Sequence, residues 1–202
     1  MNRKPTYLRI VVTTACNLAC SYCHMEGDPH QAGTPRAMHP EDLRRCLEVA
    51  AAAGIRKFKF LGGESLLSRE LPLLVACVRA AAPDADISII TAGVIRTERL
   101  DAVVAAGLDR VNVSIHGFGV EALATRYRGM AAQAHATRAR FLDRGLELGR
   151  PCKLNYVYSG PEDHADLAAL LDWAAPRPVT VAVLDNLGSA VGARGVMEAL
   201  RT

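Results

Sequence analysis

The sequence predicts an α/β protein, an incomplete (β/α)6 TIM-like barrel with parallel strands inside and helices outside. Two observations lead to this fold class. Short apolar segments rich in β-branched residues alternate with longer helical segments, and each strand–helix pair spans about 30 residues, as in a βαβ unit. The six strands that we expect are fewer than the eight that close a TIM barrel.

The predicted strands are short runs of Val, Ile, Leu and Phe bounded by turn residues. They cover residues 8–13, 57–61, 87–91, 110–115, 153–158 and 179–184. A helix is expected from Pro40, because proline at the first position and acidic residues in the first turn are typical of a helix start, and Gly54 ends it. The other expected helices cover residues 71–82, 96–106, 131–148 and 162–175, and each ends at a glycine or before a proline.

The 202 residues are enough for one domain with a sizeable core. We expect that core domain over residues 1–185, followed by a C-terminal tail over 186–202. The net charge of +3 and the scattered Lys and Arg do not predict nucleic-acid binding, and no apolar run approaches the ~20 residues of a membrane span. Because Arg9 interrupts the first apolar stretch, no signal peptide is predicted, and a cytoplasmic location is expected.

Polar residues recur at every second position of several predicted strands. These residues are Arg9 and Thr13, Lys57 and Lys59, Asn112, Ser114 and His116, and Lys153 and Asn155. Alternate residues of a strand share one face, and a helix after each strand argues against an antiparallel sheet with a solvated face. The pattern therefore predicts a polar barrel lumen, with a ligand at the C-terminal strand ends, where Thr91, Ser114 and His116 fall.

Three cysteines lie on one short loop after the first strand, Cys16, Cys20 and Cys23 in the run CNLACSYC. Three thiolates can bind three irons of a [4Fe–4S] cluster and leave the fourth iron open. A zinc site that includes His24 is the main alternative, although zinc usually takes two separated cysteine pairs. CxxCH at residues 20–24 also matches a c-type haem attachment motif, which would require export.

The remaining cysteines are interpreted as structural. Cys46 and Cys77 lie among apolar residues of expected helices and are predicted to be small buried hydrophobes. Cys152 begins the fifth expected strand and is also taken as structural.

Gly62, Gly63 and Glu64 follow the second predicted strand. The glycines permit a close backbone approach, and the adjacent carboxylate can receive an ammonium group. A CxxxCxxC loop after the first strand, combined with Gly-Gly-Glu after the second, resembles the radical S-adenosylmethionine (SAM) superfamily. Further stretches (YLRI at 7–10, KFLGGE at 59–64, GLDRVNVS at 107–114 and KLN at 153–155) resemble the branch that contains the GTP cyclase of molybdenum-cofactor biosynthesis.

The resemblance implies a role for each matching position. It implies that Cys16, Cys20 and Cys23 bind the [4Fe–4S] cluster and that SAM binds the open iron. The residues implied to contact SAM are Tyr22 (through its backbone), Gly62, Gly63, Glu64, Thr91, Ser114, Asn155 and Leu184. Those implied to face the substrate are Arg9, Lys59 and Lys153. His116 is either a catalytic acid or base, or a hydrogen-bonded residue of the lumen without proton transfer.

The implied activity is cleavage of SAM to a 5′-deoxyadenosyl radical that abstracts hydrogen from a small molecule, with electrons from a flavodoxin- or ferredoxin-like donor. The enzyme would be oxygen-sensitive. Several departures from the cyclase pattern favour a substrate other than GTP, such as a nucleoside, a sugar or a natural-product precursor: no later cysteines, no arginine in 180–184, Ser65 where proline is usual, and His116 where an acidic residue is typical. Alternatives are a glycyl-radical activating enzyme, a peptide-modifying enzyme and, least favoured, a non-catalytic metal-binding protein.

Overall fold

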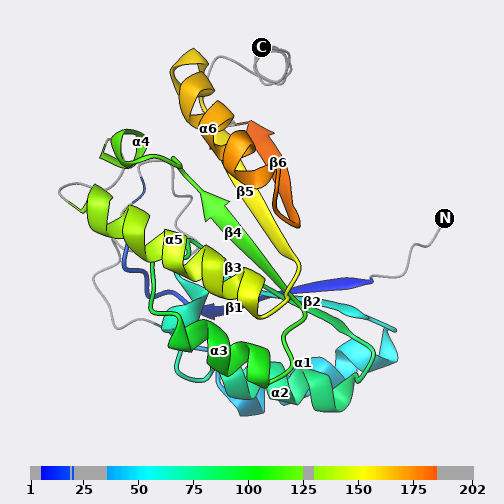
Figure 1. Cartoon of the computed structure of the whole chain (residues 1–202). Helices are drawn as coiled ribbons and strands as arrows, with labels where there is room; N and C mark the ends of the chain where they lie inside the picture. Colours follow the sequence, from blue (N-terminus) through cyan, green and yellow to red (C-terminus); the bar gives the residue numbers. More distant parts are fainter. Residues whose placement is uncertain (1–5, 19, 21–35, 125–129, 186–202) are drawn as a thin grey trace. The chain divides into compact units, whose positions relative to one another are not determined.

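Strands and helices alternate along the chain in the computed structural model (Figure 1). The structure describes residues 6–18, 20, 36–124 and 130–185. Six parallel strands follow one another in the sheet in sequence order. They are β1 (Tyr7–Thr13), β2 (Lys57–Gly62), β3 (Asp86–Thr91), β4 (Arg110–Ile115), β5 (Cys152–Tyr158) and β6 (Val179–Asp185).

All five expected helices are present. The α-helices are α1 (Pro40–Ala52), α2 (Leu71–Ala81), α3 (Glu98–Ala105), α4 (Val120–Ala124), α5 (Ala131–Glu147) and α6 (His164–Ala174), and the 3-10 helices are η1 (Ser65–Leu67) and η2 (Pro161–Asp163). Helices α4 and η1 were not predicted, because helices of five and three residues are too short to show a 3.6-residue period. The start of the last expected helix forms η2 instead, and α3 begins two residues later than expected.

The described chain divides into two compact units. The first unit contains residues 6–18, 36–91 and 95–111, and the second contains Cys20, residues 92–94, 112–124 and 130–185. The boundary falls within β4, after Val111.

In the first unit, β1, β2 and β3 form a parallel ladder whose two faces differ. Ile10, Phe60 and Ile89 lie in register across the three strands and are at most 5% exposed. Figure 1 shows α1, α2 and α3 gathered along one side of these strands, and α1 packs on α2, which packs on α3. Apolar residues of β1–β3 and of the helices thus form the core of this unit. The alternate positions, such as Arg9 and Lys57, are exposed.

In the second unit, β5 pairs with β6 from Cys152–Val179 to Tyr158–Asp185. The buried residues of β5 alternate with less buried ones, among them Lys153 and Asn155. Helix α6 packs on β6, and α4 packs on α5. Lys153 and Asn155 therefore share one face of β5, as period 2 predicted. No helix among the residues that the structure describes is both long and apolar enough to cross a bilayer.

The structure corrects one prediction about the cysteines. Cys46 is exposed rather than buried, because the buried stripe of α1 runs through Leu43, Leu47 and Ala50 and leaves Cys46 at its edge. Cys77 is half-buried, and Cys152 is buried as expected. Burial raises the pKa of the Cys152 thiol to about 12, since the interior disfavours the thiolate.

We predict a large difference in thiol reactivity between Cys152 and Cys46. At pH 8, a thiol with a pKa of about 12 contains roughly a thousandth of the thiolate of an ordinary thiol, so iodoacetamide labelling of Cys152 is expected to be about a thousand-fold slower. Peptide mass spectrometry of the native protein measures both rates, and guanidinium unfolding should equalise them. Equal labelling in the native state would contradict the burial of Cys152.

Because the folded-state pKa of Cys152 is raised, the free energy of unfolding should also fall as the pH rises from about 9 towards 12.

Candidate functional site

The two ends of the cysteine loop are held together by backbone hydrogen bonds in the first unit. Thr14 N–H donates to the Arg36 carbonyl and Met38 N–H donates to the Val12 carbonyl, each at 2.9 Å, and Thr13 forms an antiparallel bridge with Ala37. The Thr14 hydroxyl accepts from Arg36 N–H at 2.9 Å. The chain therefore leaves β1 and returns beside it, which fixes the base of the loop that carries the cysteines.

The Gly-Gly-Glu turn is packed directly against the start of this loop. Gly63 N–H donates to the Thr13 carbonyl at 2.9 Å, and Glu64 N–H donates to the Ala15 carbonyl at 2.8 Å. A Cβ on Gly62 would lie 2.3 Å from the Thr13 carbonyl oxygen, and one on Gly63 would lie 2.3 Å from that of Ala15. Side chains at these positions are sterically excluded, so both glycines are required by the close approach of the two segments.

Cys16 lies against this turn. A Cβ on Gly63 would come within 2.9 Å of the Cys16 Cβ, and the Cys16 side chain is half-buried. The glycine turn therefore positions the first cysteine by close packing. The Cys16 sulfur is a polarisable donor, and the glycine backbone beside it can approach a ligand closely. Both properties fit a residue that binds iron. The structure brings Cys16, Gly62, Gly63 and Glu64 together.

Glu64 is 1% exposed, and its Oε1 accepts a hydrogen bond from Leu66 N–H at 3.1 Å. The carboxylate therefore caps η1, a role that the sequence did not indicate. The neighbouring Ser65 is fully buried, and its Oγ donates to the Ile90 carbonyl at 2.6 Å. Ser65 thereby joins the turn to the end of β3, where Thr91 is 2% exposed. A serine in place of proline thus adds an anchor that proline could not provide.

A cationic row crosses β1 and β2 on the face opposite the apolar core. Arg9 is in register with Lys59, which is in register with Ser88. Arg9 is exposed and Lys59 is half-buried, and the Lys59 Nζ lies 5.6 Å from the centre of the Tyr7 ring. The structure thus brings together two of the three predicted substrate-binding cations.

The second unit contains the other described site residues. Along β4, Asn112 is buried, whereas Ser114 and His116 are half-buried. On β5, Lys153 is exposed and Asn155 half-buried.

Leu184 of β6 is in register with Val157 and is 45% exposed. Cys20 also belongs to the second unit and is half-buried. Tyr22 and Cys23 lie outside the described residues, as does the predicted tail 186–202.

Two charged contacts in the second unit, one buried at Arg138 and one half-buried at Asp166, were not predicted. Arg138 is 2% exposed and donates to the carbonyls of Gly117 and Phe118, while both carboxylate oxygens of Asp166 accept from the backbone after β4. A sequence signal for Arg138 did exist, because it interrupts the apolar stripe of α5. Asp166 had no such signal, since an acidic residue in the first turn of a helix is ordinary.

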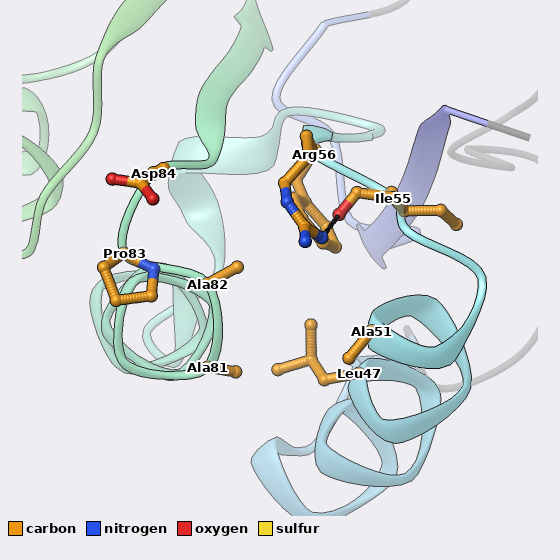
Figure 2. A pocket seen from close by; sticks show the side chains of 9 residues that line it. Leu47, Ala51, Ile55, Arg56, Ala81, Ala82, Pro83 and Asp84 are labelled. Carbon is orange, nitrogen blue, oxygen red and sulfur yellow. Dashed lines mark hydrogen bonds between the residues drawn. The ribbon is translucent and has the colours of Figure 1, made fainter.

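A cavity of about 160 Å³ lies elsewhere in the first unit, between the ends of α1 and α2 and the start of β2 (Figure 2). Its lining consists of Leu47, Ala51, Ile55, Arg56, Phe58, Ala81, Ala82, Pro83 and Asp84. The Arg56 Nη1 at its wall donates to the adjacent Ile55 carbonyl at 2.9 Å. The cavity is at the N-terminal end of β2, whereas Cys16 and Glu64 lie beyond its C-terminal end, where barrel enzymes place their chemistry. None of the predicted site residues lines it.

Known proteins resemble this chain in sequence and in fold. A family model described as "Radical SAM superfamily" matches residues 10–174. A "Probable GTP 3′,8-cyclase" of Methanosarcina mazei is 34% identical over 180 residues, which are 86% of this chain and 52% of that protein. The chain therefore spans about half the length of the curated relatives it matches.

Solved structures share the fold at low sequence identity. Methylornithine synthase has a TM-score of 0.74 and 16% identity, over 98% of this chain and 62% of that one. A structure described as anSMEcpe with bound AdoMet has a TM-score of 0.72 and 15% identity, over 91% of this chain and 50% of that one. These likenesses confirm the predicted incomplete TIM-like barrel with parallel strands.

The superfamily uses a [4Fe–4S] cluster and SAM, which are the cofactors that the cysteine loop and the Gly-Gly-Glu turn predicted. The half-buried thiol of Cys16, set against backbone that carries no side chain, fits that chemistry. The chain belongs to the radical SAM superfamily, and within it is similar to the GTP 3′,8-cyclases.

Proposed function

We propose that this chain is a radical SAM enzyme that acts on a small molecule bearing an anionic group. When bound, the [4Fe–4S] cluster and SAM would supply a 5′-deoxyadenosyl radical that removes a hydrogen atom from that molecule. The observation that carries this proposal is the packing of the Gly-Gly-Glu turn on Cys16, because it couples the cluster loop to the SAM-binding turn. The thiolates of Cys16, Cys20 and Cys23 would hold the cluster.

The chain's own residues are proposed to bind SAM and the substrate and to orient them. The Glu64 carboxylate would accept a hydrogen bond from the ammonium group of SAM. The hydrogen bond that it accepts from Leu66 N–H in η1 fixes the carboxylate before SAM binds. Thr91, Ser114 and Asn155, together with the backbone at Gly62, Gly63, Tyr22 and Leu184, are proposed to complete the SAM site. His116 is proposed as an acid or base. The family match at 10–174 lies inside the proposed core domain 1–185, and a flavodoxin- or ferredoxin-like protein is the proposed reductant.

The substrate class follows from the row across β1 and β2. Arg9 and Lys59 are on neighbouring strands about 4.8 Å apart, so two cations can contact one phosphate or carboxylate. The preceding row is different, since Lys57 is in register with Asp86, whose carboxylate is paired with Arg110, and it lies nearer the N-terminal start of β2, away from the strand ends where barrel enzymes bind ligands. Lys153 on β5 is proposed as a third contact. A phosphorylated nucleoside or sugar, or a carboxylated natural-product precursor, fits these cations.

The function is tested by anaerobic reconstitution with iron and sulfide, followed by dithionite and SAM. We expect absorbance near ~400 nm and release of 5′-deoxyadenosine by the wild type, and loss of both in Cys16→Ala, Cys20→Ala and Cys23→Ala. Cys46→Ala is the matched control, because Cys46 is an exposed cysteine of α1. A full cluster in all three loop variants, or a reconstituted wild type that leaves SAM intact, would refute the proposal.

Glu64→Gln separates the two roles of this residue. Glutamine keeps an oxygen that can accept from Leu66 N–H, so the melting temperature should change little, whereas loss of the charge should weaken SAM binding by about tenfold or more. Calorimetric titration of SAM into the reconstituted protein measures the second effect. Exposed Glu48 of α1 supplies the control, Glu48→Gln. Unchanged SAM affinity in Glu64→Gln would mean that Glu64 is a helix cap alone.

Lys59→Ala tests the anionic substrate class with GTP as the probe, because the curated relatives are named as GTP cyclases. We expect GTP binding to the reconstituted protein to weaken by about tenfold, which is the typical effect of losing one hydrogen bond to a charged group. Lys57→Ala should leave GTP affinity within about twofold, since Lys57 is the first residue of β2, one row farther than Lys59 from the C-terminal strand ends. Equal effects of the two substitutions would contradict a specific role for Lys59.

A further inference from the structure

The loop after β4 is held by two charged side chains, which bind four of its backbone polar groups. Asp166 accepts from Phe118 N–H and Gly119 N–H at 2.7 Å each, one with each carboxylate oxygen. Arg138 Nη2 donates to the Gly117 carbonyl at 2.5 Å and to the Phe118 carbonyl at 3.1 Å. We call this arrangement, Arg138 and Asp166 around residues 117–119, the loop clamp.

The loop clamp fixes the direction of two consecutive peptide groups. In the Gly117–Phe118 peptide, the carbonyl faces the Arg138 guanidinium and the N–H faces the Asp166 carboxylate, and the next peptide repeats this pattern. Rotating either peptide would direct a carbonyl at an anion and an N–H at a cation. Because hydrogen bonds to charged groups are roughly twice as strong as neutral ones, the observed orientation is strongly favoured.

The clamp is itself rigidly supported. The Tyr156 hydroxyl, on a side chain with no exposure, donates to Asp166 Oδ2 at 2.9 Å. Arg138 is 2% exposed within the buried stripe of α5. Gly117 has φ +120°, and a Cβ there would lie 3.0 Å from Ala122, so no other residue fits this turn without strain. A buried arginine and a half-buried aspartate around one three-residue loop exceed what a surface connection requires.

The residue directly before this loop is His116, at the end of β4. Since the torsion angles that lead into Gly117 set the direction of the Cα–Cβ bond of His116, a fixed loop fixes the direction in which the imidazole extends from the backbone. We propose that Arg138 and Asp166 are positioning residues that set His116, and with it the C-terminal end of β4, for the reaction. This inference rests on the proposed function for its chemical meaning, while the geometry of the clamp is independent of it.

Asp166→Asn is the most direct test, because it keeps the size of the side chain and removes the negative charge of the carboxylate that accepts two amide hydrogen bonds. Asp172→Asn, an exposed substitution on the same helix, is the matched control. The reconstituted proteins are labelled with ¹³C-histidine, and the His116 ring signal is assigned with His116→Gln. His39, at the start of α1 in the first unit, serves as the internal reference.

We expect the His116 signal of Asp166→Asn to shift or split into several signals, while His39 is unchanged. Hydrogen exchange at the Phe118 and Gly119 amides should accelerate by at least about tenfold, since they lose a charged acceptor. Asp172→Asn should match the wild type in both measurements. Should Asp166→Asn fail to fold, Tyr156→Phe, which removes a single hydrogen bond to Asp166, is expected to change the same signals by a smaller amount.

An unchanged His116 signal in a folded Asp166→Asn protein would overturn the proposal, because the clamp would then hold the loop without positioning the histidine. Unchanged amide exchange would overturn it as well. These measurements need neither substrate nor turnover. A wild type that releases no 5′-deoxyadenosine would therefore refute the proposed function, whereas the NMR result alone decides on the clamp.

Discussion

The candidate site depends on one contact, the approach of the Gly-Gly-Glu turn to the backbone that leaves β1. Two backbone hydrogen bonds, from Gly63 to Thr13 and from Glu64 to Ala15, extend the β1–β2 ladder beyond the strands themselves. That extension is possible only because Gly62 and Gly63 have no Cβ, since either Cβ would lie 2.3 Å from a carbonyl oxygen. Cys16 and Glu64 are consequently positioned by backbone pairing, which is more rigid than side-chain packing alone.

The two units use different physical means to hold their strand ends. In the first unit, the segments that follow β1 and β2 are fixed by backbone pairing and by Ser65, whose hydroxyl donates to the Ile90 carbonyl of β3. In the second unit the loop after β4 is fixed by the charges of Arg138 and Asp166. A radical reaction benefits from such rigidity, because proximity determines which hydrogen is removed.

Much of this could be predicted from the sequence, and the exceptions have physical causes. All six strands were predicted because each is a run of β-branched and apolar residues bounded by turns. Cys46 was wrongly predicted to be buried, because its apolar neighbours did not show on which side of the α1 stripe it lies. The cap formed by Glu64 was missed because a carboxylate after two glycines carries no local signal of helix capping.

The sequence by itself determined the family, the cofactors and the alternating strand faces, because these depend on residue identity and short-range spacing. Tertiary structure decided which distant residues meet: Gly63 with Cys16, Ser65 with Ile90, and Asp166 with the loop that follows His116. Such contacts join residues separated by up to 48 positions, and no local pattern encodes them. They arise only when parallel strands bring their C-terminal ends, and the loops beyond them, to a common edge.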